Sequence, residues 1–376
     1  MTELLLNFDV EFFPVGEGSR AGDAIVVNYE VAPNDFRIMV VDGGTDSSGE
    51  AIVEHLRGLY GERVFISDVV STHPDTDHSC GLRAVLRELP VQRLWVHGLW
   101  SHAGEIVGLF EDSRWTPDGL ERVIKAEYPV IEELLSLAQA QGTEVKEPFV
   151  GDAIGPFTVL SPTRGTYQHL LPQFRKTPAA NVELLKDRGI WLDAPKGLFA
   201  SLFEKAASTA ARFVPEGWFG ERLREGGITA AENESSTVLL GIFGQQRVLL
   251  TADAGCNALT WACDNAQAMC LPMAPFSLIQ IPHHGSRRNV SPSVLDRLVG
   301  PMVMPGARPT QMAVASVPKD DSQHPRRMVT NAFARRGVEV HKTQGIKWRG
   351  HCNMPPRPGE REAEPMGFSE HVEDYD

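Results

Sequence analysis

The sequence lacks long hydrophobic runs and is poor in cysteine. No apolar run reaches the roughly 18 residues that a membrane-spanning helix needs, so no spanning segment is expected. The start, MTELLLNFDVEFF, has neither a basic region nor a small-residue cleavage site, which argues against a signal peptide. Five cysteines in 376 residues is an odd number, typical of reduced thiols in the cytoplasm. We therefore expect a cytoplasmic protein with no membrane partner.

Positive charge is also scarce, and it is unevenly placed. The formal net charge is -13, which argues against a nucleic-acid binder when the chain is taken as a whole. Residues 281–350, however, contain twelve Lys and Arg against four Asp and Glu, whereas residues 351–376 contain two against seven. A basic stretch between acidic ones suggests either a local anionic partner or a solvated basic surface.

The order of hydrophobic patterns predicts an α/β fold. Hydrophobic residues make up 42% of the chain, enough for a substantial core. Runs rich in β-branched residues, such as VFISDVVST, alternate with amphipathic segments such as SSGEAIVEHLRGLYG. Residues 163–231, rich in Pro, Gly, Phe and Trp, break this alternation and are interpreted as a mostly helical insertion or lid. We expect one domain over residues 1–350 and a flexible, acidic, Pro-rich tail over residues 351–376.

The stretch STHPDTDHSCG contains the densest cluster of ionisable side chains. His73, Asp75, Asp77 and His78 follow a predicted buried strand and precede a predicted helix. Such a loop lies at the carboxyl end of a strand, where α/β proteins place their sites. Imidazole and carboxylate groups are ligands of divalent metals, and alternation along the loop can direct the first two side chains to one ion and the last two to another. We therefore predict a metal site, with an acidic surface loop as the alternative.

Two further predicted strands end on similar groups. VLLTADAG ends on Asp253, a carboxylate suited to bridge two cations, and IQIPHHGS ends on His283 and His284. Taken alone, an Asp after a strand is usually a turn or cap residue, and a His pair is often on the surface. Together with the first loop they form a set of strand-end ligands.

With these motifs the chain resembles the metallo-β-lactamase superfamily, and more narrowly the soluble hydrolase domain of competence DNA-uptake proteins. The resemblance rests on the ordered set GDAIVV, VVDGG, STHPDTDHSCGL, NESSTVLL, VLLTADAG, IPHHGS and SQHPRRM followed by EVHKTQG. It covers most of the chain apart from the insertion and the tail. It implies a four-layer αββα sandwich with a metal site along one edge of the sheets.

The resemblance also implies a role for each residue of the first loop. His73 and Asp75 would hold one divalent ion. Asp77 and His78 would hold a second, and Asp77 would also be catalytic. Family members use such a centre to convert bound water into a hydroxide that attacks an ester, amide or phosphodiester.

The remaining ligands come from the other strand ends. The second ion would take a histidine of the HHGS turn, His283 as first choice and His284 as second. Asp253 would bridge the ions, and Asp42 would orient a ligand through a hydrogen bond. One or two divalent ions are implied, with Mn²⁺ and Zn²⁺ favoured and Mg²⁺ as a further option.

Two departures from the usual superfamily pattern concern the first ion, and both also occur in the competence branch. The usual loop has His where this chain has Asp75, a harder ligand that favours Mn²⁺ or Mg²⁺ relative to Zn²⁺. The usual third-motif histidine is missing after the strand FTVL, where LSPTRG follows, and His169 is an uncertain substitute. The first ion is therefore loosely held, completed by substrate, or absent.

The reaction is inferred from the groups around the site. Ser286, Arg287 and Arg288 follow HHGS and can bind phosphate oxygens, although exposed surface positions explain the two arginines equally well. His324, in the family's His-Pro element, is a candidate general acid or phosphate contact, with a capping or core role as the alternative. Lys342, on the last predicted strand, can add positive charge, although a solvated lysine is the commoner case.

These groups suit an anionic phosphodiester substrate such as DNA or RNA, so the leading hypothesis is a metal-dependent phosphodiesterase or nuclease. The alternatives are a small-molecule hydrolase of the same fold, acting on a lactone, a phosphoester or a cyclic nucleotide, and a non-catalytic binding partner with a degenerate site. Substrate identity, metal count and oligomeric state leave no signature in the sequence.

Overall fold

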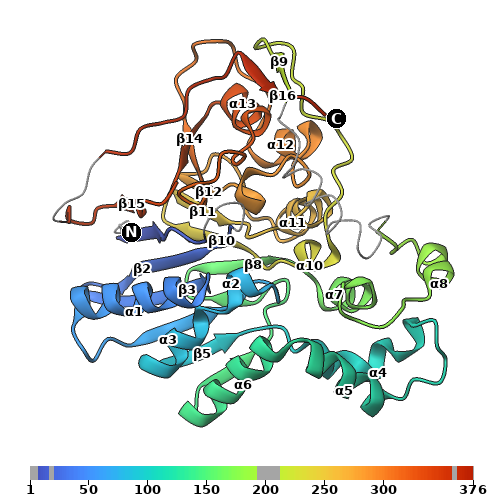
Figure 1. Cartoon of the computed structure of the whole chain (residues 1–376). Coiled ribbons are helices and arrows are strands. Elements are labelled where there is room, and N and C mark those ends of the chain that lie inside the picture. Colours follow the sequence, from blue (N-terminus) through green and yellow to red (C-terminus); the bar gives the residue numbers. More distant parts are fainter. Residues whose placement is uncertain (1–6, 17–20, 193–211, 358–361, 376) are drawn as a thin grey trace.

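Two seven-stranded β-sheets form the centre of the computed structural model, which describes residues 7–16, 21–192, 212–357 and 362–375. They lie face to face, with helices on both outer sides (Figure 1). The first sheet has the order β15 (Trp348–Cys352), β1 (Phe8–Phe12), β2 (Ala24–Ala32), β3 (Asp35–Gly43), β4 (Ile66–Val70), β5 (Val91–Trp95) and β6 (Glu144–Lys146). The second has the order β14 (Val338–Lys342), β13 (Gln311–Ala315), β12 (Leu278–Gln280), β11 (Gln246–Leu250), β10 (Val238–Phe243), β8 (Phe157–Ser161) and β7 (Ala153–Ile154).

The helices pack on the outer faces of the two sheets. Those of the first half of the chain are α1 (Asp46–Tyr60), α2 (Thr76–Ser79), α3 (Leu82–Glu88), α4 (Ala103–Ile106), α5 (Pro117–Glu127), α6 (Pro129–Gln141), α7 (Arg164–Leu170) and α8 (Val182–Asp187). Those of the second half are α10 (Ala231–Glu234), α11 (Cys256–Ala268), α12 (Pro292–Leu298) and α13 (Arg327–Arg335). Short 3-10 turns are η1 (Leu99–His102), η2 (Val107–Leu109), η3 (Leu171–Gln173) and η4 (Pro282–Gly285), and a two-stranded sheet pairs β16 (His371–Glu373) with β9 (Phe213–Pro215).

Three hydrophobic cores explain why the strands are apolar on both faces. In β2, Val26 contributes to the core under the helices, whereas its neighbour Val27 contributes to the core between the sheets. In β11, Leu249 faces α11 and α12, and Leu250 faces the other sheet. Because side chains alternate between the faces of a strand, a sheet covered on both sides needs a continuous apolar run. The predicted four-layer αββα sandwich is confirmed.

Strand ends from both sheets meet at one edge of this sandwich. His73, Asp253 and His283 each lie three residues beyond a strand, namely β4, β11 and β12. β4 pairs in parallel with β3, and β12 in parallel with β11, so each pair of strands ends on the same side. The backbone N–H of Thr237 donates to the carbonyl of Thr72 at 3.0 Å and joins the two sheets there.

Glycines permit the loop after β4 to lie against the neighbouring strands. A Cβ atom at Gly81 would collide with the carbonyl oxygen of Gly43, and one at Gly22 would collide with the carbonyl oxygen of Asp77. The Gly81 N–H donates to the Gly44 carbonyl at 2.9 Å. Such close backbone approach requires residues without a side chain. The loop that carries the clustered ionisable residues is therefore held by main-chain contacts on two sides.

The C-terminal segment is not the flexible tail that its composition predicted. β15 pairs with β1, and β16 pairs with β9. Val372 is fully buried, and a carboxylate oxygen of Glu373 accepts from the Arg327 N–H at 3.0 Å at the start of α13. Composition alone favours disorder, but these apolar and main-chain contacts offset the cost of ordering the segment.

The predicted insertion is partly helical. Residues 163–231 contain α7, η3, α8 and the short strand β9, and residues 193–211 lie outside the described part of the chain. Among the described residues, no helix is both long and apolar enough to cross a membrane.

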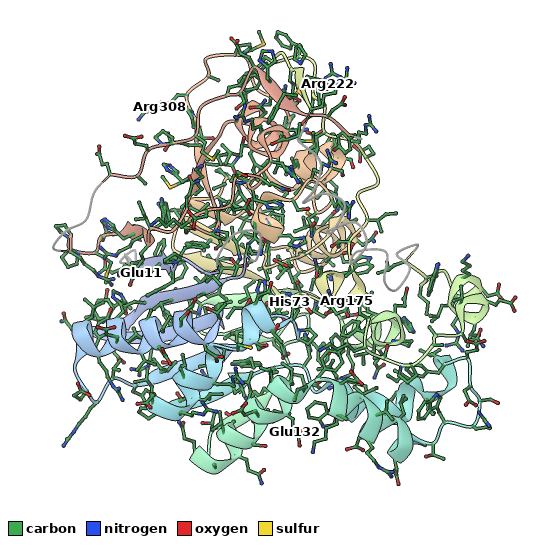
Figure 2. The ribbon with its side chains drawn as sticks, in the orientation of Figure 1. Glu11, His73, Glu132, Arg175, Arg222 and Arg308 are labelled. Atoms are coloured by element: carbon green, nitrogen blue, oxygen red, sulfur yellow. The ribbon has the colours of Figure 1, made fainter. Side chains whose placement is uncertain are left out.

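A buried ionic cluster ties the C-terminal segment to β1. Glu11, which is 1% exposed as a side chain, lies 3.0 Å from His55 and 2.7 Å from Lys347, and it also pairs with Arg357 (Figure 2). Burial opposes ionisation of Glu11, but hydrogen bonds and charges from these cations outweigh it and lower its pKa to about 2.

Replacing this carboxylate should destabilise the protein in a pH-dependent manner. We expect Glu11→Gln to lower the free energy of unfolding by about 2–3 kcal/mol at pH 7. Because the folded-state pKa lies below that of an unfolded Glu, this contribution is present above about pH 4.5. It should be lost as the pH falls towards 2. Urea unfolding of both proteins at pH 7 and pH 3 measures it.

The matched control is Glu132→Gln, which removes a partly exposed pair with Lys125. Exposed pairs contribute about 0–1 kcal/mol, so this variant should stay close to the wild type at both pH values. An equal loss of stability at pH 7 and pH 3 for Glu11→Gln would contradict the assignment.

Candidate metal centre

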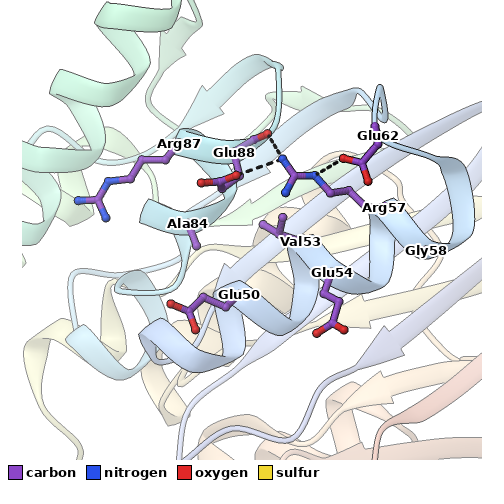
Figure 3. Close-up of a pocket in the computed structure, with 9 residues that line it drawn as sticks. All are labelled: Glu50, Val53, Glu54, Arg57, Gly58, Glu62, Ala84, Arg87 and Glu88. Carbon is purple, nitrogen blue, oxygen red and sulfur yellow. Dashed lines mark hydrogen bonds and ion pairs between the residues drawn. The ribbon is translucent and has the colours of Figure 1, made fainter.

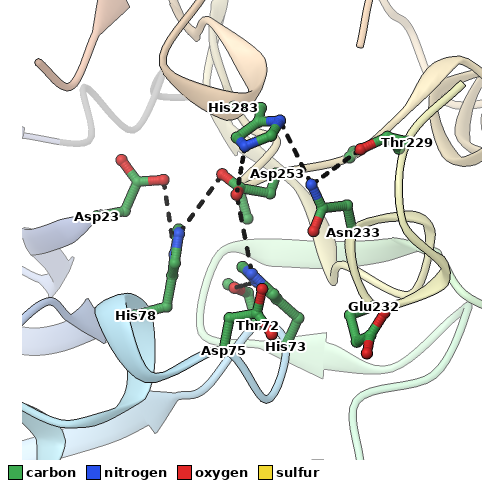
Figure 4. A network of polar contacts seen from close by, with 12 residues as sticks. Asp23, Thr72, His73, Asp75, His78, Thr229, Glu232, Asn233, Asp253 and His283 are labelled. Carbon is green, nitrogen blue, oxygen red and sulfur yellow. Dashed lines mark hydrogen bonds and ion pairs between the residues drawn. The ribbon is translucent and has the colours of Figure 1, made fainter. Parts of the chain in front are cut away.

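Four imidazoles converge on the carboxylate of Asp253. Its two oxygens lie 3.9 Å from Nε2 of His73, 3.5 Å from Nε2 of His78 and 3.5 Å from Nε2 of His283 (Figure 4). Nε2 of His284 lies 3.6 Å from Oδ1 of the same carboxylate. Asp253 is 4% exposed. The first two histidines come from the loop after β4 and the other two from η4, so the predicted strand-end ligands are brought together.

Hydrogen bonds orient the two imidazoles of the first loop. Nδ1 of His78 lies 2.9 Å from Oδ2 of Asp42 and donates to it. The hydroxyl of Thr72 donates to the same oxygen at 2.6 Å, so its own oxygen accepts from Nδ1 of His73 at 3.0 Å. Each Nδ1 therefore carries the proton, which leaves the Nε2 lone pair directed at Asp253. The structure places Asp42 where the sequence predicted an orienting carboxylate.

The two imidazoles of the HHGS turn are oriented in the same way. Nδ1 of His284 donates to the carbonyl of Ser316 at 3.0 Å, and Nδ1 of His283 donates to the amide oxygen of Asn289 at 2.8 Å. A histidine that donates through one ring nitrogen to a carbonyl or carboxylate presents the other nitrogen as a metal ligand. His78, His283 and His284 have this arrangement, and His73 differs only in that its Nδ1 donates to a hydroxyl.

Buried polar atoms without partners support a metal at this point. Among the described residues, Nε2 of His73, Nε2 of His78 and Oδ1 of Asp253 have no hydrogen-bond partner. Buried polar groups are normally satisfied, because leaving them unpaired costs free energy. Nitrogen lone pairs around a carboxylate fit a divalent ion of borderline character. The residues present therefore fit the metal that the resemblance implies.

Electrostatics act differently on the imidazoles of the centre. Burial lowers the pKa of His73, whereas burial of His78 is outweighed by the carboxylates of Asp253 and Asp42, which raise its pKa well above the ordinary value. Burial lowers the pKa of His284 to about 3. Burial opposes ionisation of Asp253, but the imidazoles of His283, His78 and His284 outweigh it and hold its pKa well below the ordinary value. The neutral imidazole of His284 and the ionised carboxylate of Asp253 are forms that bind metal, and a bound cation would displace the proton from His78.

Backbone strain is concentrated at the same strand ends. Asp42 (φ 53°), Ala252 (φ 47°), His283 (φ 47°) and His284 (φ 59°) all adopt left-handed conformations that side chains with a Cβ disfavour. Each residue in such a conformation destabilises the folded state by about 1–3 kcal/mol, so the conformation persists only where the surrounding structure requires it. Here the strain aims both consecutive histidines at one carboxylate.

The sequence analysis missed Asp23 as a site residue. It directly precedes β2 in the GDAIVV motif and is 1% exposed, and its carboxylate oxygens have no hydrogen-bond partner among the described residues. Its ligand atom lies within 4.8 Å of those of His78, Asp253 and His284, so the four could hold one ion. A carboxylate after a glycine at the start of a buried strand was the available signal.

Asp75 and Asp77, the two carboxylates of the first loop, do not point at Asp253 in the way that His73 and His78 do. Both oxygens of Asp75 accept from Nη2 of Arg175, each at 2.6 Å. A second group with the spacing of a metal site comprises Asp42, His73 and His78. Asp77 belongs to neither group, although it is largely buried and burial raises its pKa. His169, on α7, is also in neither group.

Three of the predicted substrate residues closely follow His283 and His284 along the chain. The hydroxyl of Ser286 accepts from the Arg288 N–H at 3.4 Å. The guanidinium of Arg287 lies over the ring of Tyr375 and donates to the Asp374 carbonyl, so the C-terminal segment engages it. Lys342 is at the end of β14, and burial lowers its pKa.

His324 belongs to a loop that packs against the HHGS turn. Its Nδ1 lies 2.9 Å from Oδ2 of the buried Asp321. A Cβ at Gly285 would collide with Pro325, and the Arg326 N–H donates to the Gly285 carbonyl at 3.1 Å. His324 is thereby held beside the turn that carries His283 and His284.

A surface pocket lies elsewhere, between α1 and α3. Figure 3 shows Arg57 at its wall, paired with Glu62 and Glu88 at 3.3 and 3.1 Å. It is lined mainly by exposed charged side chains, and none of the residues that line it belongs to the metal centre. The metal centre, not this pocket, has the chemistry of a site.

Comparison with known proteins supports the fold. Residues 21–158 match the family model of the "Metallo-beta-lactamase superfamily", so this part of the chain is similar to that superfamily. The match includes the loop from His73 to His78 and ends before Asp253 and the HHGS turn. A search of curated proteins found no match.

Solved structures with a similar arrangement include zinc-bound PqqB from Methylobacterium extorquens, at 12% identity and a TM-score of 0.38, covering 90% of this chain and 99% of that one. CmlA, a diiron β-hydroxylase from Streptomyces venezuelae, has 12% identity and a TM-score of 0.40, covering 92% and 54%. A long-form RNase Z from yeast has 10% identity and a TM-score of 0.35, covering 84% and 38%. At these values the similarities assign no activity.

Removing the charge that orients His78 should weaken metal binding. We expect Asp42→Asn to reduce affinity for Zn²⁺ or Mn²⁺ by about 10–100-fold, because orienting partners of metal-bound histidines have effects of this size. Competition with a coloured chelator measures the affinity. Asp264→Asn, on the exposed face of α11, is the control and should bind as the wild type does. Unchanged affinity in Asp42→Asn would show that His78 is not a ligand.

Proposed function

We propose that the protein is a metal-dependent hydrolase that cleaves phosphodiesters, with DNA or RNA as the polymer substrate. The observation that carries the metal-dependent part is the convergence of four oriented imidazoles on Asp253. A bound divalent ion supplies the chemistry, because it lowers the pKa of coordinated water to about 7 and stabilises charge on phosphoryl oxygens. The sequence resemblance to the hydrolase domain of competence DNA-uptake proteins favours the same substrate class.

A cluster of arginines beside the HHGS turn supports an anionic substrate. Burial lowers the pKa of Arg288, and the charge of Arg287 lowers it further. Burial also lowers the pKa of Arg326, with Glu373 opposing and the charges of Arg287 and Arg288 adding to the effect. Guanidinium groups close enough to repel one another concentrate positive charge that phosphate oxygens can offset.

The pair of Asp321 and His324 suits proton transfer to a leaving group. Asp321 accepts from Nδ1 of His324, which leaves Nε2 to hold a proton at the partly exposed side of the ring. A histidine held in this way beside the metal ligands can protonate the departing oxygen of a cleaved phosphodiester. Asp321 would act by orienting the imidazole.

Loss of the central carboxylate should abolish activity. With Mn²⁺, Mg²⁺ or Zn²⁺, we expect the wild type to hydrolyse bis(p-nitrophenyl) phosphate and linear DNA or RNA, and Asp253→Asn to lose at least 100-fold in kcat/KM. Absorbance at 400 nm and gel electrophoresis follow the two reactions. Asp118→Asn, at an exposed position of α5, should retain full activity.

The outcomes separate the alternatives. Hydrolysis of the small ester without polymer cleavage would favour a small-molecule hydrolase, with lactones and cyclic nucleotides as the next substrates. No turnover with any ion, together with no bound metal by elemental analysis, would overturn the proposal in favour of a binding protein.

The role of His324 as a general acid can be tested with substrates whose leaving groups differ in basicity. Nitrophenolate departs without a proton, whereas the alkoxide of a nucleic acid needs one. We therefore expect His324→Ala to reduce cleavage of DNA or RNA by about 10²–10⁴-fold and hydrolysis of bis(p-nitrophenyl) phosphate by far less. Equal losses with both substrates would exclude this role.

A further inference from the structure

An arginine from the insertion lies beside the metal centre. Arg175 follows η3 and is separated from Asp75 by 100 residues along the chain. Its Nη2 donates to both oxygens of Asp75, and its Nε lies 3.1 Å from Oε1 of Glu232.

These contacts fix the guanidinium firmly. Glu232, on α10, is 1% exposed, and the same carboxylate oxygen also accepts from the backbone N–H of Arg175 at 2.6 Å. A planar guanidinium paired with two carboxylates is well oriented, and it stays charged at every physiological pH. Asp75 and Glu232 thus already have a cation between them.

The imidazoles left for a first ion are those of His73 and His283, whose Nε2 atoms lie 3.9 and 3.5 Å from Oδ2 of Asp253. The resemblance assigns His73 and Asp75 to that ion, but Asp75 is engaged by Arg175 on both oxygens. The segment after β8, LSPTRG, contains no histidine that could complete the site. A second set of donors is intact. Each of Asp23, His78, Asp253 and His284 offers one ligand atom, and these four atoms lie within 4.8 Å of one another.

We propose that Arg175 takes the place of a second metal ion, and that the centre binds a single divalent ion through His78, Asp253, His284 and Asp23. This inference rests on the proposed metal-dependent function, and it specifies the number of bound ions and the role of Arg175.

Arg175 is also placed to contact substrate. Its side chain is 43% exposed, and its Nη1 makes no hydrogen bond among the residues that the structure describes. This nitrogen can donate to a phosphoryl oxygen of a bound phosphodiester. The guanidinium then stabilises negative charge that a second ion stabilises in two-metal enzymes.

Metal counting tests the inference without relying on activity. After loading with Mn²⁺ or Zn²⁺ and gel filtration, elemental analysis should find one ion per chain in the wild type. Asp75→Ala should also retain one ion, because Asp75 is not a ligand of it. Two ions in the wild type, falling to one in Asp75→Ala, would overturn the inference.

Substitution of Arg175 should increase the number of metal ions that bind to each chain. Arg175→Ala releases Asp75, so isothermal titration should reveal a second, weaker ion. Hydrolysis of bis(p-nitrophenyl) phosphate at one equivalent of metal should fall at least 10-fold, and Arg175→Lys should restore only part of it, since an ammonium cannot form the same paired contacts. Arg188→Ala, an exposed arginine of the same insertion, should match the wild type in both measurements.

The results distinguish this inference from the proposed function. One ion per chain and a second ion in Arg175→Ala, but no cleavage of any phosphodiester, would uphold the single-ion centre and reject the proposed reaction. Two tightly bound ions with active hydrolysis would reject the role of Arg175 and leave the proposed function standing.

Discussion

The structure of the site depends on one buried carboxylate. Asp253 lies at an edge of the sandwich where both sheets end, and it is almost inaccessible to solvent. An isolated buried carboxylate would be strongly unfavourable. Four imidazoles surround it, each with Nδ1 committed to another acceptor, so their lone pairs point at the same small volume. A divalent cation is a species that satisfies both the carboxylate and the lone pairs of His78 and His284, which face the same oxygen of Asp253.

This constraint explains features that would otherwise be costly. The left-handed backbone of His283 and His284 directs two consecutive side chains to one carboxylate, which an extended strand would send to opposite faces. Asp42 and Thr72 form a shared hydrogen-bond system that sets the ring orientation of His78 and His73. Strain and buried polar groups are thus concentrated around a single point, as they are at functional sites.

Much of the fold was predictable because the patterns that encode it are local. β-branched runs and amphipathic helices identified the strands and helices, and burial of the sheets on both faces follows from the continuous apolar runs of β2 and β11. The C-terminal segment was mispredicted as flexible, because composition does not reveal that Val372 is buried or that β16 has a partner strand. Pairing between distant segments has no local signature.

The sequence by itself determined the α/β sandwich and the principal metal-binding candidates, because ligands at the ends of strands follow from short-range order along the chain. Only the tertiary structure decided which of them share a site. It added Asp23 to the donors, and it paired Asp75 with Arg175 across 100 residues. Such a pairing depends on how the insertion packs against the first loop, and that packing is set by contacts between elements and not by the pattern within any one of them.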